Sequence, residues 1–220
     1  MATELEASLR AGESRWSYCS TFKRWLDWAM LVLTLPAVLP LGLVIALLIK
    51  LDSRGPALIQ LKRLGQWRTT FYKYKFRSMV VNAEEALQKL LKTDETIRQE
   101  YLATYKIQND PRVTRFGRLL RRTSLDELPQ VFNIVRGEMS WVGPRDILES
   151  ELSMYGEYAE KLVTVKPGLT GLWQVAGRSR LSYAERIRLD MHYIDHHSLL
   201  LDLRILLKTV PIVLLGDGAV

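Results

Sequence analysis

One uncharged segment constrains the fold of this chain more than any other feature. Residues 28–49 carry no charged side chain, and a straight helix of that length is about 33 Å long, roughly the thickness of a bilayer core. Pro36 and Pro40 lie in the middle of the segment, where each removes a backbone donor and clashes with the preceding turn. The sequence therefore predicts a bent helix that associates with a membrane.

Charges on both sides of this segment indicate how it enters the membrane. Basic residues flank it at both ends: Lys23 and Arg24 before it, and Lys50, Arg54, Lys62, Arg63 and Arg68 after it. Because basic flanks favour the cytoplasmic face, both ends belong on the same side. We predict a re-entrant helix over residues 21–54, with its break at Pro36 and Pro40. A kinked but complete span is the alternative, whereas a signal peptide is disfavoured because the apolar run starts late and is too long.

The rest of the chain has the length of one globular domain with a real core. Residues 1–20 read as a polar lead-in, and we place the domain over residues 55–220. Alternation predicts short strands at residues 57–61 and 70–76. Helical spacing and capping residues predict a helix in two pieces at 82–106, one from Asp110, and others at 127–136, 183–197 and 199–215. The predicted fold class is α+β and rich in helix, and the charged last helix is expected at an interface rather than across the membrane.

The amino-acid composition limits the classes of binding partner but does not identify one. The net charge is +7, from 31 basic and 24 acidic side chains, which favours nucleic acid, phospholipid head groups or a phosphorylated substrate. Cys19 is the only cysteine, so an intramolecular disulfide is excluded and a Cys/His zinc site is disfavoured. His192 and His196 have the spacing of a metal-binding pair, but no glutamate stands between them at the expected place, and a polar helix face is favoured.

An acidic pair set in cationic sequence points to chemistry on phosphates. Asp126 and Glu127 follow three arginines, Arg118, Arg121 and Arg122. Arginines neutralise anionic oxygens, while a carboxylate can attack phosphorus or hold a metal ion. Ser124 also fits a capping box with Glu127, and these few residues alone favour capping over catalysis. The surrounding cations, Arg145 among them, are more than a cap requires and shift the balance toward a phosphate site.

Five motifs occur in order along the chain. They are Lys75-Phe-Arg77-Ser-Met79, Asp110-Pro-Arg-Val-Thr-Arg-Phe-Gly117, Thr123-Ser-Leu-Asp126-Glu127-Leu-Pro-Gln130, Gly137-Glu-Met-Ser-Trp-Val-Gly-Pro-Arg145 and Lys166-Pro-Gly-Leu-Thr-Gly-Leu-Trp-Gln-Val-Ala-Gly-Arg178. Together they resemble the bacterial sugar transferase family, the monotopic polyprenyl-phosphate phosphoglycosyltransferases, from about residue 23 to 215. The resemblance implies a protein of the bacterial inner membrane whose proline-broken helix dips into the cytoplasmic leaflet. The catalytic domain is then expected on the cytoplasmic face.

The resemblance also implies a reaction. Enzymes of this family transfer a sugar 1-phosphate from a UDP-sugar to undecaprenyl phosphate, release UMP and so begin a surface glycan. Carried over, Asp126 would attack the sugar-bearing phosphorus and form an aspartyl phosphosugar, which undecaprenyl phosphate then attacks. Glu127 would act as metal ligand or acid/base partner, with Mg²⁺ at Asp126 and Glu127 screening the phosphates. The overall pattern is closer to members that use galactose or glucose than to those that use N-acetylated sugars.

Four arginines receive roles from the resemblance. Arg145 matches the phosphate-binding arginine, Arg121 would face the lipid phosphate, and Arg77 and Arg178 are candidates for nucleotide-sugar contacts. The chain departs from the family at Asp146, where a second proline is usual, and this leaves the local loop geometry open. It also lacks the additional membrane spans of larger members, so it resembles a short catalytic form. The expected partners are a UDP-sugar, undecaprenyl phosphate and membrane lipids, without nucleic acid; the oligomeric state stays open, a homodimer included.

Two other functions are weighed against this one. A membrane-tethered scaffold would bind nucleic acid or acidic lipid through a basic face, for which Tyr72, Tyr74, Lys73 and Lys75 are candidates. An alternating strand edge explains those four residues equally well, and a scaffold leaves the order of the motifs unexplained. A membrane phosphatase with an aspartyl intermediate would instead release sugar phosphate into water.

Overall fold

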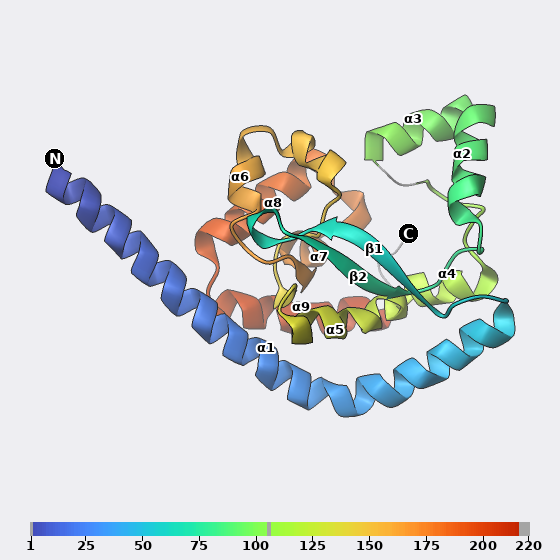
Figure 1. The fold of residues 1–220 in the computed structure, drawn as a ribbon, viewed down its shortest axis with the longest axis horizontal. Coiled ribbons are helices and arrows are strands. Elements are labelled where there is room, and N and C mark those ends of the chain that lie inside the picture. The colour runs from blue at the N-terminus through green and yellow to red at the C-terminus, as the bar shows by residue number, and fades with distance from the viewer. Residues whose placement is uncertain (1, 105–106, 216–220) are drawn as a thin grey trace.

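One long bent helix lies along the edge of the remaining elements (Figure 1). The computed structural model describes the backbone of residues 2–104 and 107–215, and the side chains of residues 21–102, 107–178 and 180–213. The helix α1 (Ala2–Asp52) continues through Pro36 and Pro40 rather than ending at either, and its ribbon changes direction in its middle. A bend is what two missing backbone donors predict. The re-entrant course through a membrane stays a prediction.

The apolar part of α1 is largely uncovered. The stretch Thr21–Asp52 is long and apolar enough to cross a membrane, with a mean hydropathy of 2.6 in its most apolar window, only 11% of which is buried. Val32, Leu33 and Leu43 are exposed by 72%, 73% and 74%. Leu31, by contrast, is fully buried. One stripe of the helix therefore packs on the domain, while the rest faces outward.

A β-hairpin follows α1. The strands β1 (Leu58–Leu64) and β2 (Thr70–Phe76) pair antiparallel around the short helix η1 (Gln66–Arg68). Both predicted strands are confirmed, and β1 extends three residues further than predicted. Phe71 and Lys73 are buried, and they lie on the same face of β2 because alternate residues of a strand point to the same side.

Three helices come next: α2 (Ala83–Thr93), α3 (Glu95–Thr104) and α4 (Arg115–Arg122). The break between α2 and α3 confirms the predicted helix in two pieces. The predicted helix start at Asp110 is wrong, because α4 begins at Arg115 after Thr114, whose side chain accepts a hydrogen bond from the Gly117 N–H at 2.9 Å. The Asp110 carboxylate instead accepts from the backbone N–H and the guanidinium of Arg112, at 3.0 and 2.6 Å. Such local bonding competes with a helix and holds these residues in a turn.

The remaining elements are η2 (Leu125–Gln130), α5 (Val131–Arg136), β3 (Ser140–Val142), η3 (Glu149–Tyr158), α6 (Ala159–Leu162), β4 (Gly168–Thr170), α7 (Leu172–Ala176), η4 (Arg178–Arg180), α8 (Tyr183–His196) and α9 (Leu199–Leu215). The strands β3 and β4 pair parallel. The helix predicted at residues 127–136 is a 3-10 turn, η2, followed by α5. Gly137 ends α5 at φ 78°, a conformation that favours glycine. The two predicted C-terminal helices are confirmed by α8 and α9.

Apolar side chains from α1, α5, β3, α8 and α9 form the main core. Each of these elements contributes a residue that is at most 2% exposed: Leu31, Ile134, Val142, Ile194 and Ile205. A smaller cluster joins the part of α1 that follows Pro40 to β2 and α4. It consists of Ile45, Ile49, Phe76 and Leu120. The parts of α1 before and after the two prolines therefore both pack against the domain, and the part after Pro40 lies beside the end of the hairpin.

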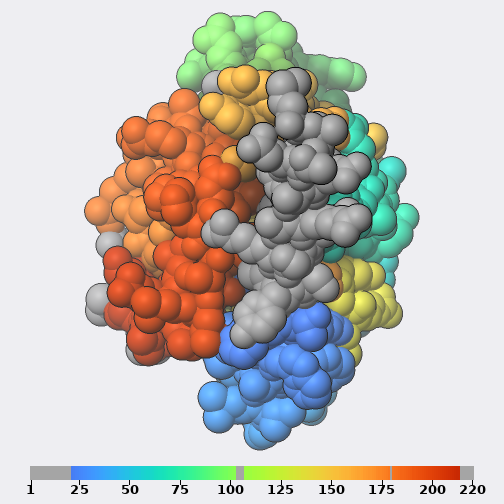
Figure 2. All heavy atoms as spheres, turned by 90° about the vertical axis from the view of Figure 1, so that its left-hand side faces the viewer, coloured from blue at the N-terminus to red at the C-terminus, as the bar shows by residue number. Residues whose placement is uncertain are grey.

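Two basic residues at the start of the apolar segment bond within the chain. Lys23 Nζ lies 2.6 Å from the Asp202 carboxylate, and Arg24 donates to the carbonyl oxygens of Ile134 and Val135 at 2.7 and 3.0 Å. These bonds tie α1 to α9 and α5, and Figure 2 shows the three segments (blue, red and yellow) meeting at one end of the molecule. Because Lys23 and Arg24 bond to groups of the protein itself, they are weaker evidence that this end of the apolar segment lies on the cytoplasmic side than solvent-exposed charges would be.

Candidate active site

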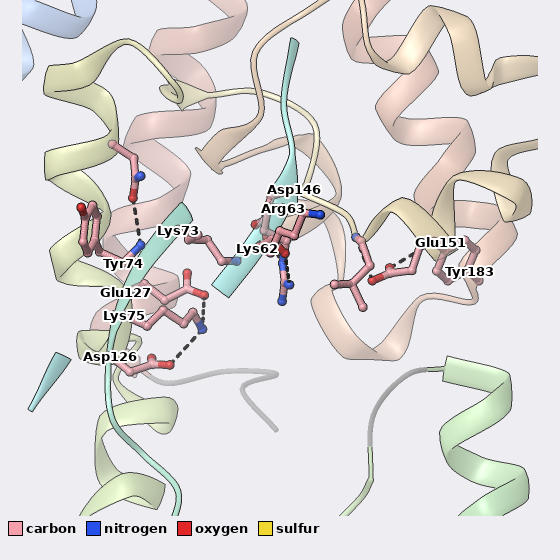
Figure 3. Close-up of polar contacts among 12 residues, drawn as sticks. Lys62, Arg63, Lys73, Tyr74, Lys75, Asp126, Glu127, Asp146, Glu151 and Tyr183 are labelled. Atoms are coloured by element: carbon pink, nitrogen blue, oxygen red, sulfur yellow. Dashed lines mark hydrogen bonds and ion pairs between the residues drawn. The ribbon is translucent and has the colours of Figure 1, made fainter. Parts of the chain in front are cut away.

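Lys75 joins the two carboxylates of the acidic pair. Its Nζ lies 3.0 Å from Asp126 Oδ2 and 2.8 Å from Glu127 Oε1 (Figure 3). Lys75 comes from β2 and the acidic pair from η2, so the fold brings together residues 51 positions apart. Asp126 is only 4% exposed, whereas the Glu127 side chain is 34% exposed. The site therefore has one buried and one partly exposed carboxylate on a shared ammonium.

Opposite charges set the ionisation of this cluster. Burial alone would lower the pKa of Lys75, but the carboxylates of Glu127 and Asp126 outweigh it and hold that pKa above its ordinary value. Burial alone would raise the pKa of Glu127, but Lys75 and then Lys73 outweigh it and hold that pKa below its ordinary value. Lys75 is therefore protonated and Glu127 ionised at neutral pH.

Lys75 is not among the site residues that the sequence predicts. The structure turns Lys73 and Lys75 inward, to the acidic side chains, and leaves Tyr72 54% exposed. The lysines and the exposed ring thus occupy different faces of β2, which argues against an aromatic and basic nucleic-acid surface. The signal that could have found Lys75 is its two-residue spacing from Lys73, since that spacing puts both side chains on one face of a strand.

Ser124 does not cap a helix. Its backbone is left-handed, with φ 56°, and its side chain makes no capping hydrogen bond. Its Oγ instead accepts a hydrogen bond from Arg178 Nη2 at 2.9 Å. The capping alternative is therefore wrong, because the acidic pair lies in a 3-10 turn whose preceding hydroxyl is turned to an arginine.

Two of the four predicted arginines lie close to the acidic pair. Arg178 binds Ser124, two residues before Asp126. Arg121 donates from Nε to the hydroxyl of Ser78 at 2.9 Å. Burial lowers the pKa of Arg121, and Asp126 is the carboxylate that opposes this effect most strongly. Arg121 is therefore within electrostatic reach of the Asp126 carboxylate, and Arg178 is bonded two residues before it.

The other two predicted arginines are bound elsewhere. Arg77 donates to the carbonyl oxygens of Ser53 and Arg54 at 2.8 and 2.9 Å, and to the Ser53 hydroxyl at 2.8 Å. These bonds satisfy carbonyl groups at the end of α1, so Arg77 ties that end to the hairpin, and its contact with a nucleotide sugar stays a prediction. The guanidinium carbon of Arg145 lies 5.9 Å from the ring centre of Trp173 on α7. Arg145 thus lies on the loop after β3, beside α7.

Asp146, the departure from the family motif, binds two cations. Its Oδ2 lies 2.5 Å from Lys73 Nζ and 2.8 Å from Arg63 Nε. Burial would raise the pKa of Asp146, but Lys73 and Arg63 outweigh it and hold that pKa well below its usual range. The carboxylate therefore ties the loop after β3 to both strands of the hairpin. This bonding fixes the loop geometry that the sequence left open.

The acidic pair suits a magnesium ion that shares its coordination with a substrate. Mg²⁺ is commonly bound by one or two carboxylates, with substrate phosphates among its other ligands. Asp126 and Glu127 supply two such groups. The position of Lys75 Nζ shows that a single positive charge can contact both carboxylates. Within the described ranges, no group of three or more His, Cys, Asp or Glu side chains could hold a metal ion. The rings of His192 and His196 stack with centres 4.2 Å apart, in keeping with the predicted polar helix face.

Known proteins resemble this chain over most of its length. The family model for bacterial sugar transferase matches residues 18–216. The exopolysaccharide production protein ExoY of Sinorhizobium fredii is 45% identical over 197 residues, which are 90% of this chain and 87% of that protein. The UDP-galactose-lipid carrier transferase of Erwinia amylovora is 42% identical over 96% of this chain. The undecaprenyl-phosphate galactose phosphotransferase of Salmonella typhimurium is 47% identical over 75% of this chain.

These relatives include one protein of similar length to this chain and two that are much longer. The chain spans most of the Sinorhizobium protein but only 44% and 35% of the Erwinia and Salmonella proteins. The family match includes β2, η2 and the loop after β3, which carry the lysine, the acidic pair and Arg145. The ordered motifs, the match over residues 18–216 and the identities above 40% lead to one conclusion: this chain belongs to the bacterial sugar transferase family.

Proposed function

We propose that this chain transfers a sugar 1-phosphate from a UDP-sugar to undecaprenyl phosphate, and so begins the synthesis of a surface polysaccharide or glycoconjugate. The names of two relatives describe galactose transfer to a lipid carrier or to undecaprenyl phosphate, and a third describes exopolysaccharide production. One structural observation carries the proposal for this chain. The carboxylates of Asp126 and Glu127 both lie within 3.0 Å of the Lys75 ammonium.

Asp126 is the proposed nucleophile. Its carboxylate oxygen attacks the sugar-bearing phosphorus, the bond from that phosphorus to the bridging oxygen breaks, and UMP leaves with the bridging oxygen and its electron pair. The enzyme then carries an aspartyl phosphosugar. A phosphate oxygen of undecaprenyl phosphate attacks the same phosphorus and expels the Asp126 carboxylate. Two displacements at one phosphorus give ping-pong kinetics.

The cations of the site suit substrates that carry several phosphate charges. Lys75 contacts both carboxylates, and its ammonium favours the ionised form of Glu127. A Mg²⁺ ion bound by Asp126 and Glu127 would supply further positive charge against the diphosphate. Arg121, Arg178 and Arg145 are the proposed donors to phosphate oxygens. Arg121 feels the charge of Asp126, and Arg178 is bonded to Ser124, two residues before it.

We also propose a monotopic placement on the cytoplasmic face of the bacterial inner membrane. α1 exposes Leu43 by 74%, while α5 exposes Phe132 by 44% and α9 exposes Leu207 by 73%. The three helices border one another at one end of the molecule (Figure 2), and their exposed apolar side chains are the proposed contact with one leaflet. A re-entrant α1 places both termini in the cytoplasm, which reporters fused at residues 1 and 220 would show. Opposite readings from the two reporters would indicate a complete span.

The proposed sugar is a plain hexose, galactose or glucose. The relatives from Erwinia and Salmonella are named for galactose, which makes UDP-galactose the first substrate to try. A comparison of UMP release from UDP-galactose, UDP-glucose and the matching N-acetylated sugars would identify the sugar.

A lipid-transfer assay tests the proposed reaction. UDP-hexose labelled in the sugar is incubated with undecaprenyl phosphate, Mg²⁺ and the purified protein in detergent. We expect label in the lipid fraction and release of UMP, and we expect Asp126→Ala to lose both. Without the lipid acceptor, UMP release should stop after a single turnover. Continued release of sugar phosphate into water would indicate a phosphatase instead, and an active Asp126→Ala variant would overturn the role of Asp126.

A further inference from the structure

Asp146 holds Lys73, which lies two residues before Lys75 on the same face of β2. Lys73 is two residues from Lys75, and two residues of a strand span about 7 Å along one face. Lys73 is 6% exposed, and its Nζ lies 2.5 Å from Asp146 Oδ2. Figure 3 shows Lys73 between the acidic pair on one side and Asp146 on the other.

Lys73 is within electrostatic reach of the acidic pair. After burial, the charges that act most on Lys73 are those of Asp146, Lys75 and Glu127, in that order. Glu127 is therefore the next carboxylate that Lys73 could bind if Asp146 were absent. A buried ammonium without a partner is strongly unfavourable, so a released Lys73 has a physical reason to turn to Glu127.

We propose that Asp146 is a positioning residue that keeps Lys73 away from Glu127, so that the acidic pair binds only the ammonium of Lys75. This inference rests on the proposed function for its catalytic consequence. Two carboxylates and one ammonium leave one net negative charge, which attracts a divalent cation and supports attack on phosphorus. A second ammonium on Glu127 would cancel that charge and occupy the carboxylate oxygens.

Arg63 provides a matched control. It is the second cation on Asp146 Oδ2, at 2.8 Å from Nε, and it lies on β1, opposite Phe71 of β2. Replacing Arg63 with methionine removes a cation from the same carboxylate but leaves the pair of Lys73 and Asp146 in place. A purely structural role for Asp146, as a clip between the loop and the hairpin, would make Arg63→Met and Asp146→Asn behave alike.

The first test measures the Mg²⁺ concentration that half-saturates UMP release. We expect Asp146→Asn to raise it about tenfold, since the released ammonium of Lys73 would then compete with the cation for Glu127. The double variant Asp146→Asn with Lys73→Met should return it to within about twofold of the wild type, because the displaced cation is gone. Arg63→Met should leave it near the wild-type value. Failure of Lys73→Met to restore the Asp146→Asn enzyme would overturn the proposal.

The second test needs no catalysis, so it separates this inference from the proposed function. Thermal unfolding is measured for Glu127→Gln, Asp146→Asn and the double variant, in the wild-type and Lys73→Met backgrounds. We expect the double variant to lose more melting temperature than the sum of the single losses, by about 4 °C, because Lys73 then has neither carboxylate. That excess should vanish in the Lys73→Met background. Additive losses in the Lys73 background would refute the inference, even if the protein proved to have no transferase activity.

Discussion

Trp141 directs both of its N–H groups at Asp27. Its backbone N–H donates to Asp27 Oδ1 at 3.0 Å, and its indole Nε1 donates to the Asp27 carbonyl oxygen at 3.1 Å. The Ser140 hydroxyl donates to the same carboxylate oxygen at 2.8 Å. Asp27 lies on α1 and Trp141 on β3, so the helix that we propose enters the membrane is bonded to the strand that leads to Arg145.

The Asp27 contacts predict a stability effect. Asp27→Ala removes the acceptor of two buried donors, Ser140 Oγ and Trp141 N–H, and we expect a loss of about 3 kcal/mol in the free energy of unfolding. Unfolding of the detergent-solubilised protein by heat or denaturant measures it. Asp52→Ala removes an exposed carboxylate from the same helix and should change stability by less than about 0.5 kcal/mol. Equal stability of the two variants would contradict the prediction.

Lys75 predicts an effect on rate and on pH dependence. We expect Lys75→Met to slow UMP release by about a hundredfold, as when one charge-stabilising group is removed from an active site. Burial raises the pKa of Glu127, and Lys75 is the group that lowers it most. Without Lys75 that pKa rises, so the acid limb of the pH–rate profile should move to higher pH. Lys62→Met, which removes an exposed lysine from the same hairpin, should leave rate and profile unchanged.

Asp146 predicts how stability depends on pH. Its pKa is held below the ordinary value, so its contribution is complete above the unfolded-state pKa, about 3.9, and is lost as the pH falls through the folded-state pKa. The melting temperature of the wild type should therefore exceed that of Asp146→Asn by a constant amount from about pH 5 to 8. The difference should shrink as the pH falls below about 4. A difference that stayed constant down to about pH 2 would show that the ionised carboxylate is not what stabilises the fold.

The proposed nucleophile predicts the position of a covalent adduct. The protein is incubated with UDP-hexose and Mg²⁺ in the absence of lipid acceptor, quenched and digested for mass spectrometry. We expect a hexose phosphate on the peptide that contains Asp126, and none in Asp126→Asn. Glu127→Gln should still accumulate the adduct, more slowly, because its carboxylate assists without bonding to phosphorus. An adduct on any other side chain would reject the mechanism.

The exposed leucines of α9 predict a membrane contact. Leu207 is 73% exposed, and we expect Leu207→Glu to weaken co-flotation with vesicles that contain anionic lipid, because a charge replaces an apolar side chain at the interface. Leu102 is 61% exposed but belongs to α3, which lies away from α1 and α9 (Figure 1). Leu102→Glu should float like the wild type. Equal flotation of both variants would exclude the α9 surface from the contact.

Several features follow from local sequence alone. Pro36 and Pro40 predict a bend in α1 because each acts on the turn that contains it, and Gly137 ends α5 because it tolerates a positive φ. Helical spacing predicts α8 and α9 closely. The adjacency of Asp126 and Glu127 is fixed by the chain itself. Each of these features depends on residues within a few positions of one another.

Local patterns also misled where a side chain had a partner that the pattern did not indicate. Ser124 and Glu127 have the spacing of a capping box, but Ser124 binds Arg178, 54 positions away. Lys23 and Arg24 read as solvated flanking charges, yet they bond to Asp202 and to the carbonyl groups of α5. Asp110 reads as a helix cap and instead pairs with Arg112. Each side chain has several chemically reasonable partners, and the choice among them depends on which ones the fold brings near.

The sequence by itself determined the bent apolar helix, most of the helices and strands, the paired carboxylates and the family. Only the tertiary structure decided that Lys75 contacts both carboxylates and that Lys73 is held by Asp146. The physical reason is the range of the interactions. Helix periodicity, proline geometry and turn conformation act over a few residues, whereas these ion pairs join segments 51 and 73 positions apart (126 − 75 and 146 − 73). Their formation depends on the packing of the hairpin against η2 and the loop after β3, which no local pattern specifies.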